Sequence, residues 1–332
     1  MSQSTENKIK WGIIGTGGIS NKFVADLPHS SNGVAYAVSS RSQESADAFA
    51  GKYNIPNAYD SYDKMLQDPE VDVIYVGTPH PLHKQNVLDA LNAGKHVLCE
   101  KPFTINAGEL EEVIALAREK KLFLMEGMWT RFLPPIRRAR EWIRDGKIGE
   151  VRLVKADFGF RIGWDPESRL LNPELGGGAL LDAGIYPVSF ASMVLGAKPT
   201  EVFSTAHIGE TGVDEQFSIL LGYEGGRAAT LNGAVRLGFP NEAYVHGTEG
   251  YIYLPQFLFG ASASLFVGGE EVETFNDDRD AEGYAFEAEE VGKLIREGKL
   301  ESDVIPLEES LDIMRLLDKV RSQWGLKYPG EQ

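Results

Sequence analysis

The sequence IKWGIIGTGGIS, residues 9–20, decides the fold of the first part of the chain. The apolar run Ile9–Ile14 predicts a buried strand, and the glycine-rich turn after it opens a helix. Gly15 permits a tight turn, and Gly17 lets a pyrophosphate approach the backbone N–H groups at the start of that helix. This order of strand, turn and helix predicts a dinucleotide-binding fold, with an ordinary glycine-rich turn as the alternative.

Further apolar runs alternate with helical patterns up to about residue 125. The apolar runs are Gly33–Ser39, Val71–Val76, His96–Cys99 and Leu122–Met125. The helical patterns are Ile19–Leu27, Ser42–Tyr53, Pro81–Ala93 and Ala107–Lys120. Because the apolar runs are continuous, they predict strands buried on both faces, as in a parallel sheet covered by helices.

The pattern changes near Val151, where strand candidates begin to follow one another with few helices between them. The candidates are residues 151–162, 201–209, 217–236, 241–254 and 264–275. Glycine-rich turns lie within three of these segments, at residues 224–226, 247–250 and 268–269, and strands joined by such short turns predict an antiparallel sheet. Helices are expected at Ala179–Leu195, Ala285–Gly298 and Leu307–Trp324.

The sequence therefore predicts an α/β protein with two domains. Residues 1–127 would form an N-terminal Rossmann domain with a doubly wound parallel sheet. Residues 128–332 would form a C-terminal α+β domain with a large open, mainly antiparallel sheet, and this domain would serve substrate binding and oligomerisation. The C-terminal helix is a candidate to pack back on the first domain.

The composition excludes some classes of partner. The 332 residues contain 33 Lys and Arg against 49 Asp and Glu, a net charge of −16. A surface this acidic repels nucleic acids and anionic membranes, so we expect neither as a general partner. The single cysteine, Cys99, excludes an intrachain disulfide and is expected to be a small buried hydrophobe. The N-terminus lacks an apolar signal core and no apolar run has membrane-spanning length, so we expect a cytoplasmic protein.

The residues at the end of the second predicted strand choose between the nicotinamide cofactors. NAD-binding domains usually place an acidic residue there, on the ribose 2′-hydroxyl. This chain has Ser39, Ser40 and Arg41 instead, and a guanidinium with two hydroxyls suits a 2′-phosphate. We therefore expect NADP, with NAD as the alternative. An Arg41 that merely faces water is the alternative structural interpretation.

Two adjacent charges, Glu100 and Lys101, follow the apolar run His96–Cys99 and precede Pro102. Charges at the edge of a dry core are costly unless they are paired or functional. Ligands bind at the carboxyl edge of a parallel sheet, so we expect both residues beside the nicotinamide. There Lys101 would donate to a substrate oxygen. A surface salt bridge is the alternative.

A second candidate site lies in GGGALLDAGIY, residues 176–186. Asp182 and Tyr186 are four residues apart, so they share one face of a helix. A phenol has a pKa of about 10, and a nearby ammonium would lower that pKa enough to make Tyr186 a general acid/base. Lys101 would suit this role, although the sequence alone does not bring the two together. A buried tyrosine with a capping aspartate is the alternative.

The chain resembles the Gfo/Idh/MocA oxidoreductases over nearly its whole length. The resemblance rests on GTGGIS (15–20), on Glu100-Lys101-Pro102 and on GGGALLDAGIYPVSF (176–190). Within the family, EGMWTRFLP (126–134) and Tyr186 look most like the dimeric dihydrodiol dehydrogenase and NADP-dependent D-xylose dehydrogenase branch. Inositol dehydrogenase-like members carry a histidine in place of Tyr186, which disfavours an inositol substrate.

This resemblance implies an NADP-dependent dehydrogenase or reductase that acts on a carbohydrate or cyclic diol. Lys101 would be the catalytic lysine, Tyr186 the general acid/base, and Asp182 the residue that binds or orients the substrate. The residues expected to hold the cofactor are Gly15, Thr16, Gly17, Gly18, Ile19, Ser39, Ser40, Arg41, Thr78, Pro79, His80, His83, Glu100 and Lys101. The resemblance also implies that Trp129, Arg131 and Phe132 approach the substrate pocket. Phe158 and Phe160 alternate with Asp157 and Gly159, so packing on one sheet face is the favoured interpretation, and both residues remain candidates for the pocket wall.

Other interpretations stay open at this point. His80 and His83 lack the additional ligands that a metal site needs, so we expect no metal. The resemblance also implies a homodimer or homotetramer built through the open face of the C-terminal sheet. The alternative functions are an NAD(P)-binding sensor without catalysis and an NAD-dependent redox glycosidase, in which the cofactor would stay bound without net turnover.

Overall fold

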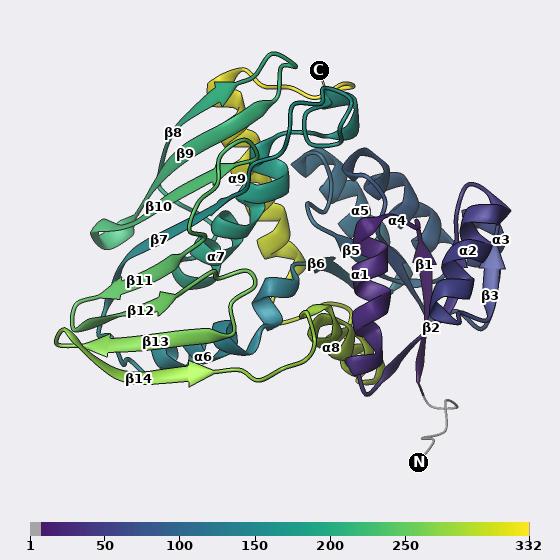
Figure 1. Ribbon diagram of the computed structural model, residues 1–332, viewed down its shortest axis with the longest axis horizontal. Helices are drawn as coiled ribbons and strands as arrows, with labels where there is room; N and C mark the ends of the chain where they lie inside the picture. The colour runs from purple at the N-terminus through teal and green to yellow at the C-terminus, as the bar shows by residue number, and fades with distance from the viewer. Residues whose placement is uncertain (1–7, 332) are drawn as a thin grey trace. The chain divides into compact units, whose positions relative to one another are not determined.

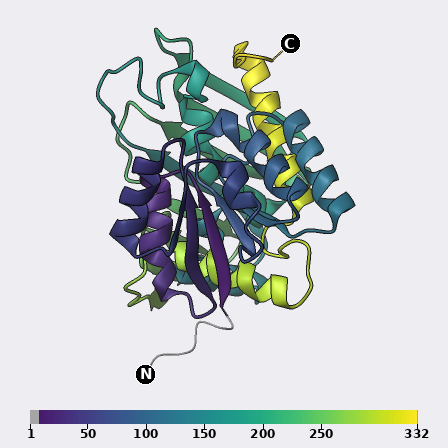
Figure 2. The same ribbon diagram turned by 90° about the vertical axis from the view of Figure 1, so that its right-hand side faces the viewer.

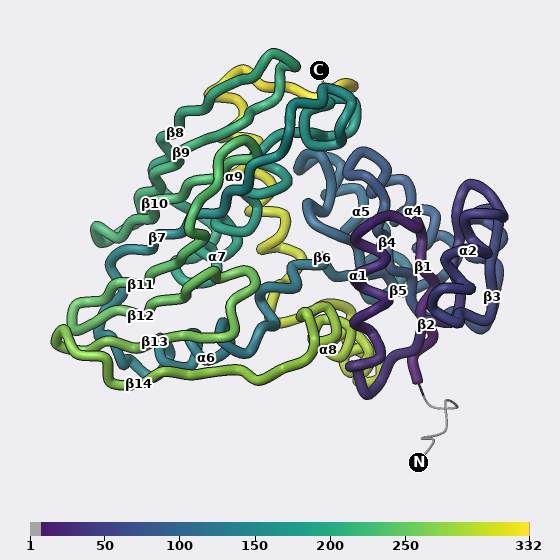
Figure 3. The backbone as a smooth tube through the Cα atoms, viewed as in Figure 1, coloured from purple at the N-terminus to yellow at the C-terminus, as the bar shows by residue number. Residues whose placement is uncertain are grey.

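The computed structural model describes residues 8–331, which fold into two compact units. Unit 1 contains residues 8–104, 108–129 and 280–310, and unit 2 contains residues 105–107, 130–279 and 311–331. After building most of unit 2, the chain returns to unit 1 through α8 (Tyr284–Arg296), a path that Figure 3 traces.

Unit 1 is built on a six-stranded sheet in the order β3-β2-β1-β4-β5-β6. Its strands are β1 (Ile9–Ile14), β2 (Gly33–Ser39), β3 (Asn57–Tyr59), β4 (Val73–Val76), β5 (His96–Glu100) and β6 (Leu124–Gly127). Every neighbouring pair is parallel, so the predicted doubly wound parallel sheet is confirmed. The strand order reverses between β1 and β4, which places the expected ligand edge at the carboxyl ends of these strands.

Helices cover both faces of this sheet, as Figure 2 shows. They are α1 (Gly18–Asp26), α2 (Gln43–Tyr53), α3 (Tyr62–Leu66), α4 (His83–Asn92), α5 (Ala107–Lys120) and α8. Asp26 at the end of α1 accepts hydrogen bonds from the backbone N–H groups of Glu282, Gly283 and Ala285, at 2.8, 3.0 and 2.8 Å. This carboxylate therefore caps α8 and holds the returning segment in unit 1.

Some boundaries in unit 1 differ from the expected ones. The strand expected at Leu122–Met125 is observed at Leu124–Gly127. Lys121 adopts a left-handed conformation, and the Leu122 N–H still bonds the Ala117 carbonyl at the end of α5, so the helix ending consumes the first expected strand residues. The short elements β3 and α3 were not expected.

Unit 2 is built on an eight-stranded sheet in the order β14-β13-β12-β11-β7-β10-β9-β8. Its strands are β7 (Val151–Gly159), β8 (Glu201–Ile208), β9 (Asp214–Tyr223), β10 (Arg227–Ala234), β11 (Ala243–Gly247), β12 (Gly250–Leu254), β13 (Ser262–Val267) and β14 (Glu270–Asn276). The pairing is antiparallel except between β7 and β10, which run parallel. The expectation of a mainly antiparallel second sheet is confirmed, with this one parallel pair at its centre.

One face of this sheet carries the core of unit 2. Phe217, Ile219 and Leu221 of β9 are buried, whereas Gln216, Ser218 and Leu220, which alternate with them, are exposed. The helices of unit 2 are α6 (Pro134–Arg144), α7 (Ile185–Leu195) and α9 (Leu307–Trp324), of which Figure 1 shows α7 and α9 against the sheet.

The segment expected as one helix from Ala179 to Leu195 has two parts. Leu180–Gly184 forms a wide π-helical turn, and α7 follows it without a break. Pro187 cannot donate a hydrogen bond to the Ala183 carbonyl, and its ring crowds that carbonyl, which explains the widened turn.

The expectation that no apolar run has membrane-spanning length is wrong, because the helical segment Pro173–Leu195 is long and apolar enough to cross a membrane by length and composition alone. In its most apolar 18-residue stretch, 89% is buried inside the fold, as in the core helix of a globular protein.

Candidate active site

The glycine turn of unit 1 forms an open cradle at the start of α1. Gly15 has a φ of +94°, and Gly17 is the N-cap of α1 with no side chain capping the helix. A Cβ added at Gly17 or Gly18 would meet no atom within 4 Å. Free N–H groups at a helix start, with open space above them, fit the pyrophosphate of a dinucleotide.

Ser20, the third small residue of the turn, has a packing role. It is fully buried, and its Oγ lies 2.4 Å from where a Cβ on Gly77 would be. The helix α1 can approach the end of β4 only because Gly77 has no side chain. This close approach between helix and strand is the part that the third glycine plays in other dinucleotide-binding turns.

The end of β2 presents the residues predicted to select the cofactor. Ser39 and Ser40 are buried, and the Ser40 Oγ lies 3.4 Å from the Thr16 Oγ1. Arg41 is exposed. Ser39 and Ser40 therefore lie next to the glycine turn, since the Gly15 N–H also bonds the Ser39 carbonyl at 3.1 Å. Arg41 follows them in the chain, and no acidic residue stands among Ser39–Arg41.

The loop after β4 is fastened by His83. The ring of His83 is fully buried, with its Nε2 2.8 Å from the Thr78 carbonyl and its Nδ1 2.9 Å from the Pro102 carbonyl. Burial lowers the pKa of His83, so the neutral ring is favoured. Because both ring nitrogens contact backbone oxygens, this side chain joins the loop after β4 to the loop after β5.

The other residues of that loop are placed near the same edge. Thr78 is buried, and its Oγ1 accepts a hydrogen bond of 2.8 Å from Asn86. Pro79 is exposed, and His80 is buried with its ring 5.7 Å from that of His83. Within residues 8–331 no group of three or more His, Cys, Asp and Glu side chains could hold a metal ion.

Glu100 ends β5 inside the core of unit 1. Its side chain is buried, and its Oε1 accepts a hydrogen bond of 2.6 Å from the phenol of Tyr75. Lys101 follows at the carboxyl edge of the sheet, partly buried, and joins Pro102 through a cis peptide bond. Glu100 thus has a structural partner, and the lysine next to it stands where ligands of such sheets bind.

More buried carboxyl groups lie behind Glu100 in unit 1. Glu126 is buried and accepts a hydrogen bond of 2.7 Å from Ser310 and one of 3.2 Å from the Phe103 N–H. Glu287 is fully buried, and neither of its oxygens has a hydrogen-bond partner among the residues that the structure describes. Burial, reinforced by the charges of Glu100 and Asp26, raises the pKa of Glu287 well above its ordinary value.

In unit 2, the π-helical turn and α7 present the two residues predicted for chemistry. Asp182 is buried and bonds the Arg169 guanidinium at 2.7 Å. Tyr186 is 7% exposed, and its ring meets Phe158 of β7 edge-on at 5.5 Å. Arg169, whose side chain is 49% exposed, is a residue that sequence reasoning missed, because nothing in its local sequence relates it to Asp182.

The predicted substrate-pocket residues fall in both units. Arg131 is buried in unit 2 and holds α7, since it donates to the Ser189 Oγ at 2.9 Å and to the Ser189 carbonyl at 2.7 Å. Phe132 is fully buried, and Phe160 is partly exposed beside Phe158. Trp129 belongs to unit 1, where it is buried against the ring of Tyr284 at 5.0 Å.

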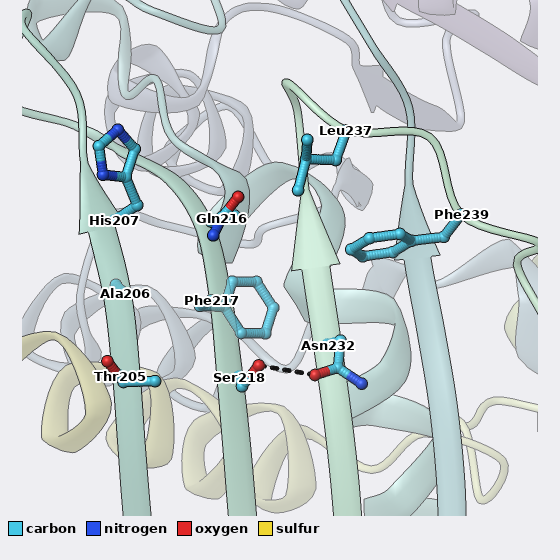
Figure 4. A pocket seen from close by; sticks show the side chains of 9 residues that line it. All are labelled: Thr205, Ala206, His207, Gln216, Phe217, Ser218, Asn232, Leu237 and Phe239. Atoms are coloured by element: carbon cyan, nitrogen blue, oxygen red, sulfur yellow. Dashed lines mark hydrogen bonds between the residues drawn. The ribbon is translucent and has the colours of Figure 1, made fainter.

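A separate shallow hollow lies on the sheet of unit 2 (Figure 4). Its polar side chains come from β8, β9 and β10, where Ser218 donates to Asn232 at 2.7 Å, and Leu237 and Phe239 stand at its side. None of the residues predicted for cofactor binding or catalysis lines it. The hollow is therefore a surface feature of the open sheet face rather than part of the candidate active site.

Comparison with known proteins supports the interpretation of both units. The family model described as "Oxidoreductase family, NAD-binding Rossmann fold" matches residues 9–128, and "GFO/IDH/MocA C-terminal domain" matches residues 136–253. The chain is 41% identical over 332 residues to a trans-1,2-dihydrobenzene-1,2-diol dehydrogenase from Xenopus laevis, covering 96% of this chain and 99% of that protein.

Two solved structures share the fold over nearly the whole chain. A 3-ketoreductase from Actinomadura kijaniata, solved with NADP and TDP-benzene, superposes with a TM-score of 0.85 at 28% identity, covering 95% of this chain and 98% of that one. An aldose-aldose oxidoreductase from Caulobacter crescentus, solved with glycerol, gives a TM-score of 0.87 at 26% identity, covering 96% and 98%.

Proposed function

Because the chain belongs to the Gfo/Idh/MocA family of NAD(P)-dependent oxidoreductases, we propose that it interconverts an alcohol and a carbonyl on a cyclic diol or a carbohydrate, with NADP as its cofactor. The observation that carries the proposal is that one chain holds both an open glycine cradle, in unit 1, and the residues Asp182 and Tyr186 at the start of α7, in unit 2. The names of two relatives state a dihydrodiol and an aldose as their substrates.

The choice of NADP rests on the end of β2. Ser39, Ser40 and Arg41 would hold the 2′-phosphate, and the glycine turn would hold the pyrophosphate. When bound, the nicotinamide accepts or donates the hydride. Replacing Arg41 with alanine should weaken NADPH binding about tenfold or more while changing NADH binding little. Fluorescence titration with both nucleotides measures this, and an equal loss for both would remove the argument.

Tyr186 is proposed as the general acid/base. In alcohol oxidation its phenolate would take the hydroxyl proton, and in carbonyl reduction its phenol would return that proton. Its ring packs edge-on against Phe158, and its backbone follows the π-helical turn directly at the start of α7. Lys101 would supply positive charge to the same substrate oxygen as negative charge develops on it.

Asp182 is proposed to bind a substrate hydroxyl. Its carboxylate is buried but bonded to the Arg169 guanidinium, and a paired buried carboxylate is far less costly than an isolated one. A carboxylate next to a guanidinium offers both acceptors and donors, which suits the neighbouring hydroxyls of a diol or sugar.

The Tyr186→Phe variant tests the proton transfer. Its kcat should fall about a hundredfold or more, with NADPH affinity unchanged, because the phenol oxygen is lost and the ring packing is kept. The assay follows NADPH absorbance with a panel of diketones, pentoses, hexoses and cyclic diols. Turnover close to wild type would show that another group transfers the proton.

We further propose that two copies of the chain pair through the open face of the unit 2 sheet. This face exposes Phe203 (59%) and Leu220 (44%) on adjacent strands. On β11 to β13 it adds an aromatic row of Tyr244, Tyr251, Tyr253 and Phe266 with ring distances of 4.5 to 6.4 Å. Exposed apolar and aromatic side chains on neighbouring strands of an open sheet face support an association site there.

Light scattering tests the pairing. Leu220→Glu should convert a homo-oligomer to smaller species, because it buries a charge at the proposed contact. Leu82, a similarly exposed leucine in unit 1, gives the matched control as Leu82→Glu. A monomeric wild type, or an assembly that survives the Leu220 change, would contradict the proposal.

A further inference from the structure

Asp214 is a buried acidic side chain at the start of the helical segment that bears Asp182 and Tyr186. It is the first residue of β9 and is fully buried. Its Oδ2 accepts a hydrogen bond of 2.6 Å from the N–H of Leu180, the first residue of the π-helical turn. A carboxylate at this place satisfies a backbone donor that has no partner within the helix.

The glycine run before that helix is shaped around the same carboxylate. Gly178 has a φ of +121°, and a Cβ on it would lie 2.3 Å from the Asp214 Oδ1. The Tyr328 phenol donates to the Gly177 carbonyl at 2.5 Å, which fixes the preceding peptide. The glycines therefore let the chain turn over Asp214 and enter the helix, and any side chain at Gly178 would displace it.

The charged group nearest to Asp214 is bonded to other side chains, so the hydrogen bonding of the Asp214 carboxylate is directed at the start of the helix. Its Oδ1 has no hydrogen-bond partner within residues 8–331. Arg321 of α9 exerts a favourable charge on it, but the guanidinium is bonded to Asp318 at 2.7 Å and to Glu331 at 2.8 Å. Tyr328 is the other titratable group that faces it. The carboxylate thus acts on the helix chiefly through its short hydrogen bond from the Leu180 N–H, with a smaller contribution from the Ala179 N–H.

We propose that Asp214 is a positioning residue: its carboxylate anchors the Leu180 end of the π-helical turn and thereby sets the placement of Asp182 and Tyr186. The inference rests on the proposed function, since it gives Asp214 a part in the same reaction. Asp182 and Tyr186 lie two and six residues beyond the anchored N–H, within two turns of it. An error of a fraction of an ångström at the anchor moves both groups together.

The hydrogen bond between Asp214 and the Leu180 N–H should depend on the charge of the carboxylate, so the proposal predicts a pH dependence that can be measured. A carboxylate accepts from an N–H more strongly than a neutral carboxyl does, and its charge suits the positive end of the helix. Burial raises the pKa of Asp214 to about 7, so the anchoring form is lost as the pH falls below neutrality. The kcat of the wild type should therefore decline toward a lower plateau on the acidic side of pH 7.

The test compares wild type, Asp214→Asn and Asp145→Asn, the last being an exposed aspartate of unit 2 as the matched control. Asparagine keeps the shape and one acceptor but carries no charge at any pH. Its kcat at pH 8 should be about fivefold to tenfold below wild type, equal to the wild-type acidic plateau, and flat from pH 6 to 8. The KM and the affinity for NADPH should change less than twofold, and Asp145→Asn should match wild type throughout.

A second measurement does not depend on activity. Hydrogen exchange of the peptide around residues 178–190 at pH 8 should be faster in Asp214→Asn than in wild type, because the Leu180 N–H is held less firmly. Wild-type kcat and an unchanged acidic limb in Asp214→Asn, or unchanged exchange, would overturn the inference. If the wild type turned over no diol, sugar or carbonyl, the proposed function would fail, and the exchange result alone would decide whether Asp214 anchors the helix.

Discussion

The Asp214→Asn substitution should also change how the free energy of unfolding depends on pH. Burial raises the pKa of this carboxyl from 3.8 to about 7. A group whose pKa is higher in the folded state stabilises the fold fully below its unfolded pKa and loses that contribution as the pH rises through its folded pKa. Each pH unit between the two values is worth about 1.4 kcal/mol. The charged carboxylate therefore lowers the free energy of unfolding by about 4 kcal/mol at pH 8, relative to pH 4.

Asparagine carries no charge to desolvate, so Asp214→Asn should be more stable than wild type at pH 8 and nearly equal to it at pH 4. The upper limit of the gain is about 4 kcal/mol, because the new amide N–H groups also need acceptors. Urea unfolding at pH 4, 6 and 8, followed by tryptophan fluorescence, measures the difference in midpoint at each pH. A variant less stable than wild type at pH 8, or a difference independent of pH, would refute this account of the buried charge.

Two further predictions concern buried groups elsewhere. In unit 1, Glu287→Gln should become more stable than wild type as the pH rises above 4.5, because burial raises the pKa of Glu287 and the wild type must then take up a proton on folding. Thermal unfolding at pH 5 and 8 measures the difference in stability. A gain confined to pH 5 would contradict this prediction. In unit 2, Gly184→Ala should lower the free energy of unfolding by about 1–3 kcal/mol, measured by urea unfolding, because its Cβ would lie 2.6 Å from the ring of Phe217. Gly196→Ala is the control: its Cβ would meet no atom within 4 Å, but Gly196 has a φ of +94°, so this variant shows the effect of backbone strain without a clash.

The elements that sequence reasoning placed well are those with a regular apolar pattern. Strands β1 and β2 begin and end at the expected residues, as does α5. The two strands are apolar runs, and α5 has its buried residues at helical spacing, so local pattern and tertiary burial agree in all three. The edge strand β3 has three partly exposed residues, Asn57–Tyr59, and its place depends on pairing with β2 rather than on its own sequence.

The candidate site was predictable where one local stretch holds the chemistry. The glycine cradle follows from residues 15–20 because strand, turn and helix are consecutive there. Arg169 and Asp214 were not foreseen, because each reaches its partner across the fold: Arg169 meets Asp182, and Asp214 meets Leu180 thirty-four residues earlier in the chain. The glycine run before Leu180 is the one sequence feature related to Asp214. It indicates that another group packs closely against the backbone there, but it does not identify that group.

The buried acids themselves connect stability to function. A chain with a net charge of −16 has abundant surface for its carboxyl groups, yet Asp214 and Glu287 lie fully inside. An amide side chain of the same size is expected to make either site more stable at neutral pH, because burial raises the pKa of each carboxyl. Groups that lower stability persist at positions where the fold is shaped for chemistry rather than for packing alone. For Asp214 that shape is visible in the side-chain-free Gly178 and in the anchored helix start, so the energetic cost and the geometry point to the same role.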